Sequence, residues 1–521
     1  MRIPRRRRAR LAALVGPAVL ACALTLGSPA DDELAHRTLD NADQLLKEGK
    51  VEQALRDFEQ VYTAYPDSGL ADDALFRIGS YYYPVDTVDA LGTIPEASIV
   101  KARDLFQKIK TKYPGEDNAP GALLKLGWIA LDPSNPQRSL DEAYAAFSGV
   151  VNIYPASPQV DRALFGAGYA DYLAARYDKS IGSFARVAEE FPHGPAADDA
   201  HYQMGLAWMN QGAWIRALEE FQTVRNQYPT SHLASRCLDR TTQIYTLKVR
   251  SGVSGKPPFA HDPSYAPALP AEAARGDAAL AVDGANALHL LDSRTGALYR
   301  LDHEGKLLST GAPMPGGVSL TLDPAGVEIL AAGSKVRSGA ESISPSRQEG
   351  GTARPLTRIV AAVRIGLKDL ALLDEDRNEI LLYTGDAAKL KLLYRDATGR
   401  ARLAGLAVGA GGRLYTIDRR SRRVLEISAE GVSKEVPVPA GADQELQEPV
   451  AVAADDIGDL FVLDKRAAAV IVMTVDGKIV QKIQSQPATA AEFSSPTALA
   501  IGPRAEIYVH DARRKTVLRF W

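Results

Sequence analysis

ALEEFQTVRNQYP, residues 217–229, places a small residue, a phenylalanine four positions later and a proline eight positions beyond that, with an aromatic residue before the proline. The same pattern occurs four more times between residues 54 and 192, and 37 to 48 residues separate successive prolines. Internal periods of this length are the sequence signature of repeat architectures. The five copies begin at Ala54, Ala102, Ala143, Ser180 and Ala217.

Each copy is expected to form the second helix of a helix pair. A small residue lets two helices approach closely, the phenylalanine fills the groove one turn later, and the proline ends the helix because its ring cannot continue one. Gly168 and Gly205 stand twelve residues before the small residue of their copies, and Gly79 and Gly127 take the same place with insertions. We therefore predict about five helical repeats plus a capping helix over residues 31–250.

This spacing resembles the tetratricopeptide repeat (TPR), and Tyr65-Pro66-Asp67-Ser68 is similar to the exported bacterial kind. The resemblance is closest to the TPR lipoproteins of outer-membrane β-barrel assembly and to the periplasmic TPR protein of the Tol-Pal system. Asp171 departs from the family, which usually has a large packing residue there.

The resemblance implies a solenoid whose concave face, formed by the first helix of each pair, binds a peptide or a partner protein. Aromatic residues suit such capture because they supply contact area at low entropic cost. The alternative is that aromatic residues at helical spacing are packing core between repeats. The family's groove positions correspond here to Phe76, Tyr83, Trp128, Phe165, Tyr169, Tyr172, Tyr202 and Met209.

Glycines and five prolines in residues 251–272 mark a domain boundary. Beyond this segment apolar residues recur at every second position, and a second repeat begins. Its unit is an apolar strand that ends in aspartate, with an apolar residue six positions later. One copy is hidden around residues 327–332, because the first two aspartates lie two periods apart. The aspartates are Asp292, Asp374, Asp418, Asp464 and Asp511.

Six such units over residues 273–521 predict a six-bladed β-propeller. The last unit stops after its third strand, so we expect the segment Phe259 to Leu269 to supply the outer strand and close the ring. The spacing resembles the NHL family of propellers, although the family's Asn and Arg are mostly missing and Asn378 is present in the third unit. The predicted fold class is thus an all-α TPR solenoid followed by an all-β six-bladed propeller.

The strand-ending aspartates are expected to accept backbone hydrogen bonds, because a catalytic residue has no reason to recur in nearly every blade. The same turns carry arginines that would form a ring on one face of the propeller disc. Such a ring suits an anionic partner such as lipid headgroups, lipopolysaccharide phosphates or an acidic protein. The alternative is that they are solvated turn residues. The turn arginines are Arg294, Arg377, Arg420, Arg466 and Arg513.

No catalytic residue, metal site or cofactor is predicted. Some NHL relatives are enzymes that hold a metal with histidines from several blades, but the four propeller histidines occupy different positions in their units. The segment from Arg337 to Pro355 is rich in Ser, Gly and charge, and predicts a disordered insertion. The four histidines are His261, His289, His303 and His510.

Residues 1–30 are typical of an export signal, with an arginine-rich start, an apolar stretch over residues 11–26 and small residues before Asp31. The apolar stretch is shorter than the roughly 20 residues that span a bilayer. Cleavage after Ala30, lipidation at Cys22 in a loose lipobox and an uncleaved anchor all remain open. Cleavage or lipidation would give a periplasmic protein or an outer-membrane-anchored lipoprotein. After cleavage at Ala30, Cys237 has no cysteine to pair with.

The amino-acid composition excludes several classes of protein and of partner. The 521 residues are 46% hydrophobic and 24% charged, which excludes collagen-like, disordered and multi-span membrane classes. Acidic residues outnumber basic ones by 64 to 61 although the first 30 residues hold six arginines and no acid, so nucleic acid is not an expected partner. We predict a non-enzymatic protein-interaction scaffold of the bacterial cell envelope. The alternative is a propeller that acts as an enzyme or small-ligand sensor, with the TPR domain as its targeting module.

Overall fold

The computed structural model divides the chain into two compact units. One comprises Met1–Ala130 and Ser134–Pro136, and the other comprises Leu131–Pro133 and Gln137–Trp521. Residues 1–28, which hold most of the predicted export signal and Cys22, lie outside the described part. The structure describes residues 29–249, 258–270, 273, 275–323, 325–349, 352–365, 369–384, 389–409, 412–428, 431–437, 446–484 and 493–521.

The described N-terminal region is helical, as predicted, and contains eleven α-helices. Among the described residues, no helix combines the length and apolar character needed to cross a membrane. A 3-10 turn, Val88–Ala90, follows α3, and a π-helical turn, Tyr245–Val249, follows α11. The helices are α1 Pro29–Lys47, α2 Val51–Ala64, α3 Ala71–Tyr82, α4 Glu96–Lys112, α5 Ala119–Leu131, α6 Leu140–Ile153, α7 Val160–Leu173, α8 Tyr177–Glu190, α9 Ala197–Asn210, α10 Trp214–Gln227 and α11 Ala234–Ile244.

The predicted contact between glycine and phenylalanine is what packs the helices of a pair. A Cβ atom on Gly205 in α9 would lie 2.5 Å from the ring of Phe221 in α10. The same atom on Gly168 in α7 would lie 2.8 Å from Phe184 in α8. The phenylalanine of every copy is fully buried, so the repeat pattern records helix packing.

Two of the tyrosines that precede a repeat proline link successive repeats. The hydroxyl of Tyr113 donates to the carbonyl of Pro66, one repeat earlier, at 2.8 Å. Tyr228 makes the equivalent bond to Pro192 at 2.9 Å. The Tyr-Pro pair therefore ends a helix and also ties it to the preceding turn.

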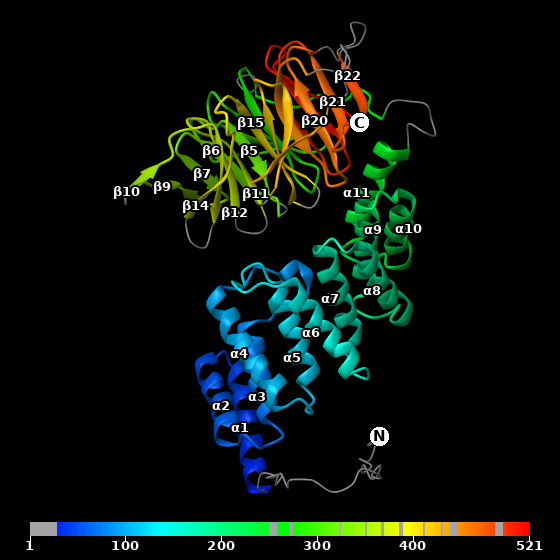
Figure 1. Ribbon diagram of the computed structural model, residues 1–521, viewed down its shortest axis with the longest axis vertical. Coiled ribbons are helices and arrows are strands. Elements are labelled where there is room, and N and C mark those ends of the chain that lie inside the picture. The colour runs from blue at the N-terminus through cyan, green and yellow to red at the C-terminus, as the bar shows by residue number, and fades with distance from the viewer. Residues whose placement is uncertain are drawn as a thin grey trace. The chain divides into compact units, whose positions relative to one another are not determined.

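The C-terminal region is a six-bladed propeller of antiparallel sheets, as predicted (Figure 1). Each of the first five blades has four strands in chain order, and the sixth has three. The blades are β1 Ala278–Val282, β2 Leu288–Asp292, β3 Leu298–Leu301 and β4 Leu307–Gly311; β5 Ser319–Leu322, β6 Glu328–Ala332, β7 Lys335–Ser338 and β8 Glu341–Ile343; β11 Ile359–Ile365, β12 Asp369–Asp374, β13 Glu379–Thr384 and β14 Lys389–Arg395; β15 Leu403–Val408, β16 Leu414–Asp418, β17 Arg423–Ile427 and β18 Ser433–Glu435; β19 Pro449–Ala454, β20 Asp459–Asp464, β21 Ala469–Thr474 and β22 Ile479–Gln484; β23 Pro496–Ile501, β24 Ile507–Asp511 and β25 Thr516–Phe520.

The segment around His261 lies beside β25 of the three-stranded blade, where the sequence placed the closing strand. Ala260 and Trp521 exchange backbone hydrogen bonds of 3.2 and 3.0 Å, and His261 is paired antiparallel with Phe520. The guanidinium of Arg519 binds the carboxylate of Asp262. The distance from Nε of Arg519 to Oδ2 of Asp262 is 2.9 Å. Residues that precede the first blade thus complete the last one, which joins the two ends of the ring.

The predicted disorder of residues 337–355 is wrong for the part that the structure describes. This segment includes the end of β7, all of β8, and a separate hairpin of β9 Ser346–Glu349 and β10 Thr352–Pro355. Arg347 anchors the hairpin through buried ion pairs with Asp374 and Glu379 of the third blade. Most side chains of β8 and β10 are exposed, so these strands have no apolar period for a sequence pattern to detect.

The up-and-down order of strands gives the propeller two distinct ends. In the first blade, β1 meets β2 at the pair Val282 and Leu288, and β2 meets β3 at the pair Leu291 and Leu298. We call the end with the first-to-second-strand turns the AB end, and the end with the second-to-third-strand turns the BC end. Antiparallel strands place these two sets of turns on opposite sides of the disc.

Candidate functional site

Five of the eight predicted groove side chains are packed into the helical core. Tyr83 and Trp128 are at most 1% exposed, and Phe165, Tyr202 and Met209 are also buried. The backbone of Tyr83 accepts a hydrogen bond from the buried Lys125, which also forms an ion pair with Asp86. These five side chains therefore stabilise the repeats and offer little surface to a partner.

The other three predicted groove residues, Phe76, Tyr169 and Tyr172, are only half-buried. Tyr169 stacks on Phe165 at 6.3 Å between ring centroids and on Tyr172 at 6.2 Å. The Tyr172 hydroxyl accepts a 3.2 Å hydrogen bond from Asn210 of α9, and burial raises its pKa to about 12. Along α7 the aromatic residues thus form a stacked row, which we call the tyrosine row: Phe165, Tyr169 and Tyr172.

The strand-ending aspartates hold the turns of the BC end, as predicted. Asp464 accepts hydrogen bonds from the amides of Gln447 and Glu448, in the segment that enters its own blade. Asp511 does the same with Ser494 and Ser495. Each of these carboxylates connects the turn after the second strand to the residues just before the first strand of the same blade. Its role is therefore to hold the backbone of the BC end in place.

The five predicted arginines lie on these turns, and every one is exposed. The topology therefore places them together on the BC end, on blades one, three, four, five and six. Within the described part of the chain, Arg420, Arg466 and Arg513 form no side-chain hydrogen bond or ion pair. Three unneutralised guanidinium groups on one end favour contact with an anion.

A cavity of about 880 Å³ runs among the first strands of all six blades. Its wall consists mainly of Ala, Val and Leu positions of β1, β5, β11, β15, β19 and β23. At the BC end its lining includes Ser293, Glu375, Arg358 and Arg419. The ion pair between Arg358 and Glu375 spans 2.8 Å, so this mouth carries both charges.

Within the described ranges, no three His, Cys, Asp or Glu side chains gather as metal ligands. The four propeller histidines are dispersed: His261 lies in the closing segment, and His303 is largely exposed in a turn. His510 is buried and lies 2.6 Å from the hydroxyl of Thr497. His289 takes part in a contact between blades.

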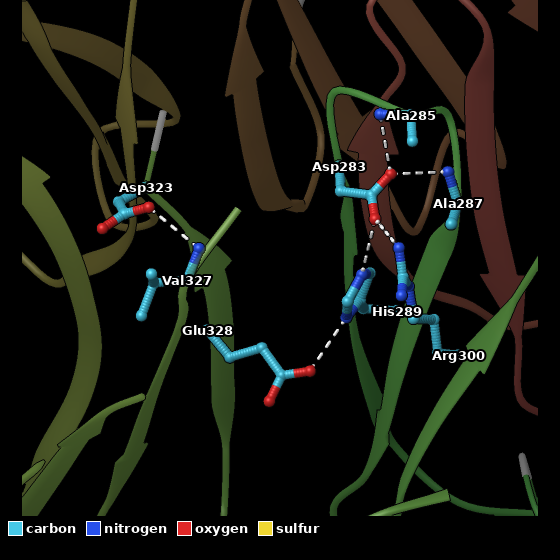
Figure 2. Close-up of polar contacts among 8 residues, drawn as sticks. All are labelled: Asp283, Ala285, Ala287, His289, Arg300, Asp323, Val327 and Glu328. Carbon is cyan, nitrogen blue, oxygen red and sulfur yellow. Dashed lines mark hydrogen bonds and ion pairs between the residues drawn. The ribbon is translucent and has the colours of Figure 1, made fainter. Parts of the chain in front are cut away.

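Figure 2 shows that contact at the AB end of blades one and two. The ring of His289 in β2 lies between Glu328 of β6, at 2.9 Å, and Asp283, at 3.2 Å. Asp283 also accepts from the Ala287 amide at 2.8 Å and from Arg300 at 2.7 Å. Burial alone would raise the pKa of Asp283, but these hydrogen bonds together lower it. The network fastens blade one to blade two.

The sequence contained a signal for these turns that lies outside the predicted repeat pattern. Asp323 accepts from the amide of Val327 four positions later, as Asp283 does from Ala287 (Figure 2). Asp455 repeats the arrangement with Asp459 in blade five. In these three blades, an aspartate that accepts the amide four residues later therefore marks the AB end, just as the predicted aspartates mark the BC end.

Three charged pairs join the last helical segment to the AB end of blades five and six. Asp239 in α11 binds Arg504 at 2.7 Å, and Arg240 binds Asp456. Lys248 in the π-helical turn binds Asp459, whose side chain is fully buried, at 2.7 Å. One hydrophobic cluster continues beneath these pairs from Phe221 and Cys237 to Phe461 and Ile507. The repeat pattern did not predict this joint, because its residues lie outside both repeat signatures.

Comparison with known proteins supports the helical repeats directly. A tetratricopeptide-repeat family model matches residues 199–231. No curated protein matches the chain.

Solved structures similar to about half of the chain include enzymes. A streptogramin B lyase is 15% identical with a TM-score of 0.38, covering 50% of this chain and 97% of its own. A virginiamycin B lyase from Staphylococcus aureus is 14% identical with a TM-score of 0.34, covering 49% and 81%. A gluconolactonase from Xanthomonas campestris is 11% identical with a TM-score of 0.35, covering 47% and 86%. At these values the likenesses carry no conclusion about activity. The chain combines a helical region that contains a tetratricopeptide repeat with a six-bladed β-propeller.

Proposed function

We propose that this protein is a non-enzymatic interaction scaffold that holds one partner on its TPR helices and a second on its propeller. The observation that carries the proposal is the use of opposite ends of the propeller. Charged pairs from α11 and the π-helical turn reach the AB end, at Asp456, Asp459 and Arg504. The exposed arginines lie on the BC end. The helical segment therefore meets the propeller at one end, while the exposed arginines lie at the opposite end.

The helical partner is proposed to contact the tyrosine row. Tyr169 and Tyr172 keep part of their rings exposed while stacking fixes their orientation. Rigid aromatic side chains make strong contacts because little conformational entropy is lost on binding. A peptide or protein segment with apolar side chains fits this surface.

The propeller partner is proposed to be anionic. Arg294, Arg377, Arg420, Arg466 and Arg513 give the BC end a set of exposed positive charges in an otherwise acidic chain. Complementary charge speeds encounter and selects the orientation of a partner. Binding at this end should therefore weaken as the salt concentration rises.

We further propose that the scaffold works in the bacterial cell envelope. This part of the proposal rests on the sequence of residues 1–30 and on the TPR resemblance. The mass of the N-terminal peptide from the native host tests it. A chain that begins at Asp31 supports export, a lipidated Cys22 supports a membrane anchor, and a chain that begins at Met1 with no membrane association contradicts both.

Reciprocal capture tests the two-surface proposal. The double variant Tyr169→Ala, Tyr172→Ala should lose one set of bound proteins, and the triple variant Arg420→Ala, Arg466→Ala, Arg513→Ala should lose another. Tyr81→Ala is the control, because Tyr81 is an exposed helical tyrosine that lies on α3, outside the tyrosine row. Loss of the same set with both variants would contradict two separate surfaces.

A second candidate function is supported by the cavity of about 880 Å³, which lies within the range of small-molecule sites. In this case the propeller would bind a small ligand or act as an enzyme, with the helices as a targeting module. Mass spectrometry of small molecules extracted from the purified chain, with metal analysis of the same sample, tests this candidate. A stoichiometric ligand or metal supports it, and their absence from chain purified from its native host argues against it.

A further inference from the structure

We propose that the seam between blades three and four, at the BC end, binds a phosphate-bearing ligand through Arg402, Arg419 and Arg420. The inference deepens the proposed anionic docking role of the BC end and rests on it. It names the residues of one site and the chemistry of its ligand: a phosphate monoester, either free or as the headgroup of a lipid.

The backbone holds these three arginines next to one another. The carboxylate of Asp418 accepts hydrogen bonds from the amides of Arg402 at 2.8 Å and Arg420 at 3.0 Å. The amide of Arg419 donates to the carbonyl of Arg402 at 2.9 Å. Three arginine backbones therefore meet around one buried carboxylate.

Asn378 of blade three fixes the other side of the seam. Its side-chain nitrogen donates to the carbonyl of Ala401 at 2.6 Å, and its side-chain oxygen accepts from the amide of Leu403 at 2.7 Å. These two bonds flank Arg402 and clamp its segment to the neighbouring blade. The seam is thus built before any ligand arrives, which lowers the entropic cost of binding.

Among the described residues, the three guanidinium groups have no counter-ion. Arg402, Arg419 and Arg420 are exposed, and in the described part of the chain their side chains form no hydrogen bond or ion pair. Two other arginines of the same blades are neutralised, because Arg395 pairs with Glu379 and Arg423 pairs with Glu435. The difference sets the seam apart from ordinary paired surface charge.

The carboxylates around the seam are already engaged. Glu375 pairs with Arg358, and Asp376 accepts a hydrogen bond from Thr357. Asp396 accepts from the amides of Arg400 and Ala401, and these bonds with that of Thr398 lower its pKa. Asp418 is held by the backbone and by Ser421. Among the described residues, none of these four carboxylates forms an ion pair with Arg402, Arg419 or Arg420.

Phosphate fits this arrangement better than a single carboxylate. A phosphate monoester carries close to two negative charges at neutral pH and offers three oxygens, and each guanidinium can donate two parallel hydrogen bonds. Arg419 also lines the mouth of the central cavity, which leaves room for the esterified group. Charge and hydrogen-bonding capacity thus favour a phosphate ester over a carboxylate peptide.

Titration of the full chain with sn-glycerol 3-phosphate at low salt tests the site. We expect one equivalent to bind, and we expect Arg402→Ala or Arg419→Ala to weaken binding by at least about tenfold, the loss of a charge-assisted contact. Arg56→Ala is the control, because it removes an exposed arginine of α2 whose side chain forms no hydrogen bond or ion pair within the described part of the chain. It should leave affinity within about twofold. Thermal unfolding of each variant confirms that the fold is intact.

Vesicles distinguish the two sources of the phosphate. Co-sedimentation with phosphatidylcholine vesicles that contain phosphatidic acid, but not with pure phosphatidylcholine, identifies a lipid headgroup, and Arg419→Ala should abolish it. Binding of glycerol phosphate without vesicle binding identifies a soluble ester. Both results support the site.

Three results would overturn the inference. Wild-type chain that binds neither glycerol phosphate nor the anionic vesicles has no such site. Equal weakening by Arg56→Ala and Arg419→Ala would show diffuse attraction by the positive charges of the chain and no specific site. Binding of poly-glutamate that glycerol phosphate cannot displace would assign the seam to an acidic protein. If phosphate binds as predicted while the capture variants lose no partner, the scaffold proposal fails and the seam site stands.

Discussion

At the scale of single residues, helix packing depends on glycines that face a phenylalanine. Gly205→Ala would place a methyl group 2.5 Å from the ring of Phe221. We expect a loss of about 1–3 kcal/mol in the free energy of unfolding, as for other overpacked cores. Gly182→Ala is the control, because a Cβ atom at Gly182 in α8 meets nothing within 4 Å. It should be neutral or stabilising by up to about 1 kcal/mol, since alanine favours helix. Urea unfolding followed by circular dichroism measures both, and equal effects would contradict a packing role for Gly205.

A second residue-scale prediction concerns the buried Asp455. Its burial, with the charge of Asp459 beside it, raises its pKa above the value of about 3.9 in an unfolded chain. Between these two pKa values the folded state binds more protons than the unfolded state. The free energy of unfolding therefore falls as pH rises through this window.

Asp455→Asn removes this dependence while its side-chain oxygen can still accept from the amides of Ile457 and Asp459. We expect the variant to gain stability relative to wild type as pH rises from 5 to 9. Melting temperatures over this range measure the difference. A difference that stays constant with pH, or shrinks, would contradict the assignment.

At the scale of elements, the ring is closed by the segment from Ala260 to Asp262 beside β25. The side chains of Arg519 and Asp262 are only 15% and 7% exposed, and the guanidinium of Arg519 lies 4.5 Å from the ring centre of Tyr265. Removing one partner of a buried pair costs about 3–5 kcal/mol because the other charge is left without compensation. Arg519→Ala and Asp262→Ala should each destabilise the propeller by about this amount. Their double variant should cost less than the sum, and additive losses would show that the pair does not couple.

Elements with a strict period were predictable, and elements without one were not. The Phe221 pattern predicted the helix pairs and the Asp511 spacing predicted the blades, because each repeats a packing requirement. The β9–β10 hairpin was missed because Arg347, and no apolar period, anchors it. Burial of Trp128 could not be predicted, since the helical spacing is the same for a buried and an exposed aromatic residue. Arg402 was missed because it lies just before β15, whereas the predicted arginines follow the aspartates that end the second strands.

At the scale of the whole molecule, α11, the π-helical turn and blades five and six share one continuous core. Lys248→Ala would leave the buried Asp459 without its cation, at a cost of about 3–5 kcal/mol. Asp239→Ala should cost at most about 1 kcal/mol, because Arg504 is about half exposed. Hydrogen exchange should then rise in both α11 and β20 of the Lys248 variant. Faster exchange in only one of the two would show that they do not share a core.

The most direct test of the central claim is whether two partners bind at the same time. Once reciprocal capture has identified one partner lost with the tyrosine-row variant and another lost with the arginine variant, both are added to the purified chain. Native mass spectrometry then reports the stoichiometry. We predict a complex that contains the chain and both partners, because the two surfaces are separate. Two binary complexes, with each partner displacing the other, would contradict the two-surface scaffold.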